Sequence, residues 1–420
     1  MRDSRKKGKK KNAKIALLVI ETTLIIVALI IGGFGIYYTT ASDETKIHMR
    51  NGLIKELSGC SLVRNILLSS EHEEYDEKVK DPDFNEENVD INEGVKKKLT
   101  GYTNIALFGL DARDGEFEKD THSDSILVVS INNDTGDVKL VSLYRDTMLK
   151  IRKRNGESKY GKANQAFFLG GAEGAVSMLN TNLDLDISDY VVVNFSGLTE
   201  IIDALGGIDV NITDEEQFFI NGYLVETRKV TGMDSEDVPQ SGNVHLNGLQ
   251  ATAYCRIRYT SFFDEEGNEY REDMGRTARQ RHVLMKLVDK AKAAGSDRLI
   301  KIARMILNSN TEEETFIKTS MDFDEIMDMI PIAIDFTLSD TTGFPFTLAM
   351  PDIDGESMVV AEGLSYNVEK LHKYLFENEY YHVSSEVNKI SDYIMDYTGI
   401  KEVRLKEDIE EESTEDASDN

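Results

Sequence analysis

The chain has 420 residues, of which 40% are apolar, so it can form one large domain or two ordinary ones around a sizeable core. Its formal net charge of −28 excludes a protein built to coat nucleic acid, because the phosphate backbone would repel it. Its two cysteines, Cys60 and Cys255, lie far apart in sequence, which excludes a disulfide framework and a cysteine-based zinc site.

The N-terminal part combines a basic segment with an apolar one. Residues 1–14 contain eight Lys and Arg residues, and residues 15–38 form a nearly continuous apolar stretch. As a helix this stretch would span roughly 36 Å, enough to cross a bilayer core of about 30 Å. The positive-inside rule then predicts that residues 1–14 are cytoplasmic and that everything after residue 38 is extracellular. A cleaved signal peptide is the alternative, although its apolar region would be only about 7–15 residues long.

Composition also suggests where a folded domain begins and ends in the sequence. Residues 39–98 are polar and acidic, and we interpret them as an extracellular stalk between the membrane and the domain. Residues 99–400 alternate between strand-like and helix-like segments, which predicts a single α/β domain. Residues 401–420 are rich in Asp and Glu, and we expect them to form a disordered acidic tail.

Three apolar runs early in this domain have the length and composition of strands: residues 105–110, 126–131 and 138–143. Charged residues flank each run. Asp111 follows the first, Asp124 precedes the second, and Arg145 and Asp146 follow the third. Loops at strand ends are where α/β domains place ligand-binding groups. Two carboxylates together with arginines suit a divalent cation and a phosphorylated substrate.

The rest of the domain continues the alternation. The pattern predicts strands over 190–194, 208–212, 253–259, 346–350 and 357–361, and helices over 173–182, 196–205, 275–295, 323–335, 367–377 and 387–397. Arg256 and Arg258 would share one face of the strand over 253–259, because strand side chains repeat every two residues. Arg276 and Arg279 would share one stripe of the helix over 275–295.

These arginines and carboxylates have the chemistry of a pyrophosphate site. Guanidinium groups bind phosphate oxygens in a planar, bidentate manner, and carboxylates hold a hard cation against the same oxygens. The sequence contains no P-loop, no nucleophile elbow and no paired metal-binding histidines.

Seven motifs, in this order and spacing, carry a family resemblance: NIALFGLDAR, the SDS of HSDSILVVSIN, LVSLYRDT, KANQAFFLGG, DYVVVNFSGLTEIIDALGGIDVNI, HLNGLQATAYCRIR and GRTARQRHVL. Over roughly residues 99–385 the chain resembles the LytR-CpsA-Psr family of membrane-anchored glycopolymer phosphotransferases. The resemblance implies an α/β sandwich with an apolar tunnel for a polyprenyl chain. It also implies transfer of an anionic glycopolymer, such as teichoic acid, from an undecaprenyl pyrophosphate carrier to peptidoglycan outside the membrane, with release of undecaprenyl phosphate.

The resemblance implies roles for individual residues. Asp111 and Asp124 would bind a divalent cation, Mg²⁺ or Mn²⁺. Either Asp146 or one of these metal-held aspartates would orient or deprotonate the acceptor hydroxyl, and Arg145 completes the expected catalytic residues. The residues expected around the pyrophosphate are Arg113, Arg145, Lys162, Arg256, Arg258, Arg276, Arg279 and Gln280. The apolar residues expected to line the lipid tunnel are Phe195, Leu198, Ile202, Val283, Leu284 and Leu287.

Two positions depart from the family pattern, and two other functions stay open. His122 stands where the family usually has Arg before Ser-Asp, and Tyr144 replaces the common Pro before Arg-Asp. The alternatives to a transferase are a polyprenyl pyrophosphate hydrolase, which would use water as the acceptor, and a non-enzymatic envelope regulator or lipid-binding sensor. Binding of nucleic acid is not expected, because the domain is acidic and predicted to be extracellular.

Overall fold

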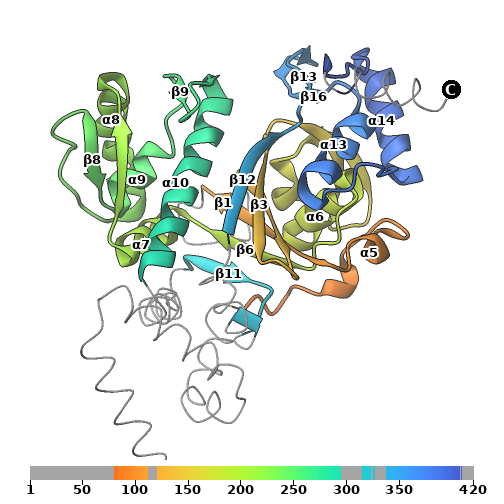
Figure 1. Cartoon of the computed structure of the whole chain (residues 1–420), viewed down its shortest axis with the longest axis horizontal. Helices are drawn as coiled ribbons and strands as arrows, with labels where there is room; N and C mark the ends of the chain where they lie inside the picture. The colour runs from red at the N-terminus through yellow and green to blue at the C-terminus, as the bar shows by residue number, and fades with distance from the viewer. Residues whose placement is uncertain are drawn as a thin grey trace, which may run out of the picture. The chain divides into compact units, whose positions relative to one another are not determined.

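Six strands form the central sheet of the computed structural model, in the order β11-β6-β1-β2-β3-β12 (Figure 1). The structure describes residues 80–111, 121–294, 315–322, 325–326, 337–406 and 408, all within one unit, Asn65–Asn420. The strands of the sheet are β1 (Tyr102–Leu110), β2 (Ser123–Asn132), β3 (Asp137–Leu143), β6 (Asp189–Val193), β11 (Ile317–Thr319) and β12 (Thr337–Phe344). The three apolar runs predicted to be strands are therefore β1, β2 and β3.

The strand directions bring charged residues to one edge of this sheet. β2 runs antiparallel to both β1 and β3, with Leu110 opposite Ser123 and Leu127 opposite Ser142. β6 is parallel to β1, and β12 is parallel to β3. The carboxyl ends of β1, β3, β6 and β12 and the amino end of β2 consequently lie at the same edge. Asp111, Asp124 and Arg145 follow or begin these strands at that edge.

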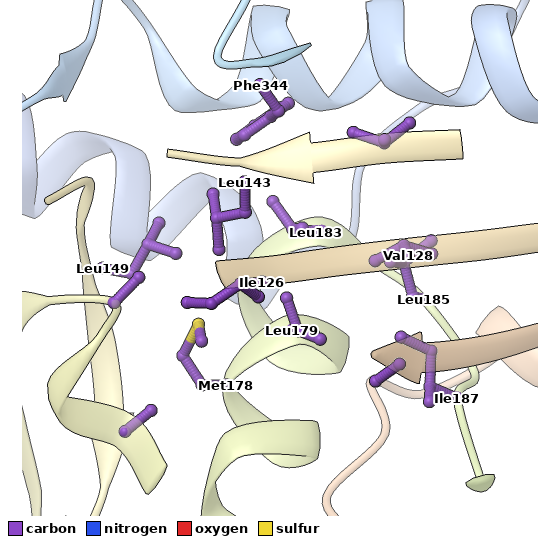
Figure 2. Close-up of a cluster of buried hydrophobic side chains, with 14 of the residues drawn as sticks. Ile126, Val128, Leu143, Leu149, Met178, Leu179, Leu183, Leu185, Ile187 and Phe344 are labelled. Carbon is purple, nitrogen blue, oxygen red and sulfur yellow. The ribbon is translucent and has the colours of Figure 1, made fainter. Parts of the chain in front are cut away.

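One face of the sheet packs against the helix α6 (Gln165–Leu183), and α13 (Leu364–Phe376) and α14 (Ser385–Thr398) join the same core. Figure 2 shows Leu179 and Leu183 of α6 beside Ile126 and Val128 of β2, and all four are buried. Burying each such side chain contributes about 1.5–3 kcal/mol. Because strand side chains alternate, Leu107 and Leu127 point to the opposite face.

The opposite face carries a second core with its own elements: α7 (Phe195–Leu205), β7 (Ile208–Ile212), α8 (Asp214–Thr231), β8 (Gly242–Leu246), α9 (Gly248–Tyr254) and α10 (Glu272–Ala294). The helix α10 crosses this side of the molecule and packs on α7, β7, β12 and the small hairpin of β9 (Phe262–Phe263) and β10 (Glu269–Tyr270) (Figure 1). The arrangement confirms a mixed α/β fold with helices on both faces of the sheet.

Short elements complete the described part of the chain. They are the 3-10 helix η1 (Glu86–Asn88), α5 (Val95–Lys98), β4 (Met148–Arg152), β5 (Ser158–Lys162), β13 (Leu348–Ala349), β14 (Asp352–Ile353), β15 (Glu356–Ser357) and β16 (Val360–Ala361). The helix α6 is bent where Gly171 takes a left-handed φ of 67°, a backbone conformation that glycine adopts without steric cost.

The prediction of a strand over 253–259 is wrong. The chain instead forms α9, which ends at Tyr254, and Arg256 and Arg258 lie in the loop that follows. A capping box starts this helix: the Asn247 side chain accepts from the Gln250 amide, and the Gln250 side chain accepts from the Asn247 amide. Burial of all seven helical residues then outweighs the strand propensity of the aromatic and cysteine residues. The helix α8 had no counterpart in the prediction.

The folded domain begins before residue 99. Lys80 forms a parallel bridge with Thr319 at the sheet edge, and the Tyr190 hydroxyl donates to Asp81. Val95 and Leu99 are buried in the core beside α6. Residues 80–98, expected in the stalk, thus pack on the domain, and the apolar side chains of Phe84, Val89, Ile91 and Val95 join its core. Asp408, expected in the acidic tail, contacts Lys370 of α13 at 2.9 Å.

Several predictions fall on residues that the structure does not describe. These are the membrane segment over 15–38, the stalk up to residue 79, Arg113, and most of the helix over 323–335. Within the described residues, none of the helices combines the length and apolarity needed to cross a membrane.

Candidate active site

A cavity of about 340 Å³ lies between the second face of the sheet and the helices α7, α8 and α10. Leu107 and Leu127 line its floor, and α10 contributes Val283, Leu284 and Leu287 to its wall. Asp111, Asp124 and the arginines of the loop after α9 also line it. The cavity therefore has an apolar end and a charged end, as an amphiphilic ligand would require.

Asp124 is the centre of the charged end. Its carboxylate forms an ion pair with Arg145 and lies 3.9 Å from Arg258 Nη2 and 3.8 Å from Arg276 Nη1. Arg276 Nη2 also donates to the backbone carbonyl of Asp124 at 3.2 Å. Three arginines, from the turn after β3, the loop after α9 and the helix α10, thus converge on one residue at the start of β2.

Asp273 belongs to the same group, although the sequence analysis did not select it. Its Oδ1 lies 2.8 Å from Arg276 Nη2, 3.5 Å from Arg145 Nε and 3.9 Å from Arg258 Nε. Its position three residues before Arg276, in the first turn of a helix, was the signal that could have identified it. We refer to Arg145, Arg258, Arg276, Asp124, Asp146 and Asp273 as the arginine–carboxylate cluster.

Burial and mutual contact shift the pKa values of this cluster. Burial alone would raise the pKa of the Asp124 carboxyl, but Arg276 and Arg145 hold it below its usual value. Burial lowers the pKa of Arg276 to about 10, against the opposing effect of Asp273. Burial also opposes the charge of Arg145, yet Asp273 and Asp124 raise its pKa. Asp124, Arg145 and Arg276 are therefore charged at neutral pH.

Two arginines of the cluster each have one buried N–H group that makes no hydrogen bond. Within the described part of the chain, Nε of Arg145 and Nε of Arg276 are buried and donate no hydrogen bond. Asp273 Oδ1 is likewise buried and accepts none, because its close contact with Arg276 lacks hydrogen-bond geometry. The Arg276 side chain is only 3% exposed. An unsatisfied buried donor costs about 1–3 kcal/mol, and such atoms gather where a ligand completes the site.

Arg256 lies at the same cavity but outside the cluster. Its guanidinium donates to Glu226 at 2.9 Å and to Thr227 Oγ1 at 2.8 Å, both on α8. It stacks over the Phe195 ring at 4.6 Å and lies 5.6 Å from the centre of the Tyr223 ring. Arg256 and Arg258, predicted to share one strand face, therefore point to different partners from one loop.

Arg279 is not at the cavity, which corrects the prediction that it contacts a pyrophosphate. Its side chain is fully buried and donates from Nε to Glu216 Oε1 at 3.0 Å. Its other nitrogens donate to the carbonyls of Ile257, Thr260 and Ser261. The reason is geometric: three helical residues advance by about 300°, so Arg279 points about 60° away from Arg276 and into the core.

The remaining polar candidates occupy the periphery of the site. Lys162 Nζ lies 3.7 Å from Asp146 Oδ1 and 3.6 Å from Glu356, and Asp146 Oδ2 lies 3.7 Å from Arg145 Nε. Lys162, Asp146, Arg145 and Asp273 do not line the cavity, whereas Gln280 does. Gln280 donates to the carbonyl of Cys255 at 3.4 Å, close to the loop that carries Arg258.

Five of the six predicted tunnel residues line the cavity: Phe195, Leu198, Val283, Leu284 and Leu287. Ile202 does not, because it is fully buried within the second core. The two departures from the family pattern fit their surroundings. His122 stacks on Phe168 with ring centres 5.4 Å apart, and the Tyr144 amide donates to the Phe344 carbonyl at 3.0 Å, a bond that proline could not make.

A cation would have to share its ligands with a substrate. Among the described residues, no three or more His, Cys, Asp or Glu side chains are arranged to hold a metal ion. Asp111 and Asp124 line the same cavity, however, and magnesium commonly binds one or two carboxylates together with substrate phosphates. The donor set fits that mode of binding.

Comparison with known proteins gives consistent matches. The LytR_cpsA_psr family model matches residues 64–368. A polyisoprenyl-teichoic acid–peptidoglycan teichoic acid transferase TagU of Bacillus mycoides is 32% identical over 217 residues, which cover 50% of this chain and 62% of that protein. TagU of Enterococcus faecalis is 32% identical over 232 residues, 55% of this chain and 65% of that protein. The chain thus spans less than two thirds of each relative.

Solved structures match as well. The crystal structure of a Streptococcus agalactiae protein superposes with a TM-score of 0.54 at 24% identity and covers 70% of this chain and 95% of its own. This likeness shows that the two proteins share a fold.

Proposed function

Because this chain belongs to the LytR_cpsA_psr family, we propose that it transfers an anionic glycopolymer from an undecaprenyl pyrophosphate carrier to peptidoglycan. The curated relatives are teichoic acid transferases, which supports a transferase over other activities. Transfer to the glycan releases undecaprenyl phosphate.

The observation that carries the proposal is the arrangement of the cavity. Asp124, Arg258 and Arg276 of the arginine–carboxylate cluster line one end, with an unused donor on Arg276, and the other end is lined by leucine and valine side chains. A prenyl pyrophosphate has the matching two-part chemistry. Its phosphate oxygens can accept from guanidinium groups, and its hydrocarbon can replace water in the apolar end.

The charge of the cluster supports a divalent cation. Arg145, Arg258 and Arg276 carry three positive charges, and Asp124, Asp146 and Asp273 carry three negative ones, so the cluster is formally neutral. A pyrophosphate brings at least two further negative charges, which a cation such as Mg²⁺ or Mn²⁺ would offset. Asp111 and Asp124 would hold this cation, and it would supply charge neutralisation at the phosphate oxygens.

The transfer step follows from this arrangement. An acceptor hydroxyl oxygen forms a bond to the phosphorus that carries the glycan, and the bond from that phosphorus to the bridging oxygen breaks. Prenyl phosphate leaves with the electron pair. Arg145, Arg258 and Arg276 stabilise the negative charge on the phosphate oxygens. Asp146, or one of the two aspartates that would hold the cation, would accept the hydroxyl proton.

We also propose that residues 15–38 anchor the protein with its domain outside the cell membrane. The basic residues 1–14 support this orientation. Protease added to intact, wall-stripped cells should remove the domain and spare the N-terminal segment. A protected domain would overturn the orientation.

Product analysis tests the activity. The purified full chain is incubated with a prenyl pyrophosphate-linked glycopolymer and Mg²⁺, with and without soluble peptidoglycan strands. A transferase forms glycopolymer–peptidoglycan and prenyl phosphate only when the strands are present. Equal release of prenyl phosphate without them would identify a hydrolase. Tight lipid binding with no product in either mixture would instead support the regulator or sensor.

A further inference from the structure

Four aromatic side chains form a partly exposed strip beside the cavity: Phe218, Phe219 and Tyr223 of α8, and Tyr259 of the loop after α9. Phe218 is 72% exposed and Tyr259 is 74% exposed. The rings of Phe218 and Phe219 lie 5.5 Å apart, and those of Phe219 and Tyr259 lie 6.1 Å apart. We call these four residues the aromatic strip. Exposed aromatic side chains that lie next to one another on a protein surface commonly mark a binding site.

The strip adjoins the charged end of the cavity. Tyr223 and Tyr259 line the cavity, and Tyr259 directly follows Arg258. The Tyr223 ring lies 5.6 Å from the Arg256 guanidinium. The apolar end, by contrast, is formed by Leu284 and Leu287 of α10. A ligand on the strip would therefore meet the phosphate end of a bound lipid and not its hydrocarbon.

We propose that the aromatic strip binds the sugar rings of the acceptor glycan strand; this inference rests on the proposed function. The flat, C–H-rich face of a pyranose ring stacks on the electron-rich face of an aromatic ring, and its hydroxyls remain free to bond with water or neighbouring polar groups. Phe218 and Tyr259, the two most exposed rings of the strip, would each stack on one sugar of the strand. A strand seated there presents its hydroxyls to the arginine–carboxylate cluster.

Charge favours the acceptor over two other occupants. Asp214 and Glu215 are exposed in the first turn of α8, within one turn of Phe218 and Phe219. These carboxylates repel a polyanionic glycopolymer chain, and they equally repel the anionic lipids of a bacterial membrane surface. A peptidoglycan strand has an uncharged sugar backbone, so its sugars can approach the strip.

Calorimetric titration of the full chain in detergent tests the proposal. The probe is a soluble β-1,4-linked N-acetylglucosamine oligomer, which reproduces the pyranose backbone without peptides. Phe218→Ala and Tyr259→Ala should each weaken binding by about tenfold, as expected for a central aromatic contact. Tyr397→Ala is the matched control, because Tyr397 is 50% exposed and stacks on Tyr393 on the distant α14. It should bind the oligomer like the unaltered protein.

Three results would overturn the proposal: equal affinity in all variants, loss of binding only to anionic vesicles, or loss of binding only to poly(glycerol phosphate). The last two would assign the strip to the membrane or to the donor chain. Binding of prenyl pyrophosphate is measured on the same samples. Failure of the unaltered protein to bind it, with strip-dependent oligomer binding intact, would reject the proposed function and not the sugar site. Normal lipid binding with strip-independent oligomer binding would reject only the sugar site.

Discussion

Arg279 and Glu216 form a buried ion pair in which Arg279 Nε donates to Glu216 Oε1 at 3.0 Å. The other carboxylate oxygen of Glu216 accepts from the Thr213 amide at 3.0 Å and so caps the start of α8. Arg279 also donates to the carbonyls of Thr260 and Ser261. The pair therefore connects α8, α10 and the loop that carries Arg258, and it fixes the position of Arg258 without touching the cavity.

Arg279→Ala should lower the free energy of unfolding by about 3–5 kcal/mol, because it leaves Glu216 as a buried unpaired charge. The double substitution Glu216→Leu with Arg279→Met should recover much of this loss, since it removes both charges. Denaturant unfolding followed by circular dichroism measures both values. An Arg279→Ala protein of normal stability that fails to bind prenyl pyrophosphate would mean that Arg279 contacts the ligand after all.

Arg258→Lys and Arg276→Lys should each reduce transfer by about 1.5–3 kcal/mol of transition-state stabilisation, because an ammonium lacks the planar pair of donors. The double variant should cost less than the sum, since both residues act on one ligand. Arg271→Lys is the control: Arg271 is exposed and pairs with Glu269 at the surface. Steady-state rates decide the matter, and near-normal rates in both cluster variants would remove the pyrophosphate assignment.

Asp111→Asn and Asp124→Asn should each weaken Mn²⁺ binding in the presence of a prenyl pyrophosphate and sharply reduce transfer. Each removes one of the two carboxylates proposed to hold the cation. Electron paramagnetic resonance measures free Mn²⁺ directly, and thermal unfolding verifies that the variants remain folded. Asp134→Asn, in the exposed turn after β2, should leave both properties unchanged. Unaltered Mn²⁺ affinity in either cavity variant would exclude that residue as a ligand.

The stability of the domain should fall as the pH drops from about 6.5 to about 4. Burial lowers the pKa of His372 to about 4, whereas an unfolded histidine titrates near 6.5, so the unfolded chain binds the additional proton across this range. The expected loss is about 3 kcal/mol at 1.36 kcal/mol per pKa unit. Urea unfolding at several pH values measures the slope. His372→Gln should flatten it, and His122→Gln, at an exposed position, should not.

A chain that begins at residue 80 should be markedly more stable than one that begins at residue 99. The shorter chain lacks the Lys80 bridge to Thr319 and the buried side chain of Val95. The shorter chain also lacks Asp81, which accepts a hydrogen bond from the Tyr190 hydroxyl. Thermal unfolding of the two purified fragments compares them, and equal melting temperatures would restore residue 99 as the boundary of the domain.

Local sequence patterns were sufficient to predict several strands and helices. Apolar runs bounded by polar residues identified β1, β2 and β3, and the predicted strand over 208–212 coincides with β7. The predicted helix over 196–205 begins one residue earlier, at Phe195, because Asn194 is its N-cap. The pairing of β12 with β3 had no local signal, since it joins residues about 200 positions apart.

The candidate site divides in the same way. Charged residues at strand ends identified Asp124 and Arg145, because antiparallel pairing must bring those ends together. Helical spacing could group Arg276 with Arg279 but could not say which of them faces the cavity and which faces the core. The role of Arg256 depended on Glu226, a residue of the helix α8 that was not predicted. The spacing of Asp273 to Arg276 could have identified it as a candidate. Its contacts with three arginines, seen only in the structure, are what assign it to the cluster.

The helix α10 carries Arg276 near its amino end and Leu287 farther along, and both residues line the cavity. At about 1.5 Å per residue, Arg276 and Leu287 are separated by roughly 16 Å along the helix axis. The helix fixes this separation. For a prenyl pyrophosphate held at Arg276, this separation would correspond to the length of hydrocarbon that reaches Leu287, the last residue of α10 that lines the cavity. Carriers that differ only in the length of their distal hydrocarbon should therefore bind with the same affinity.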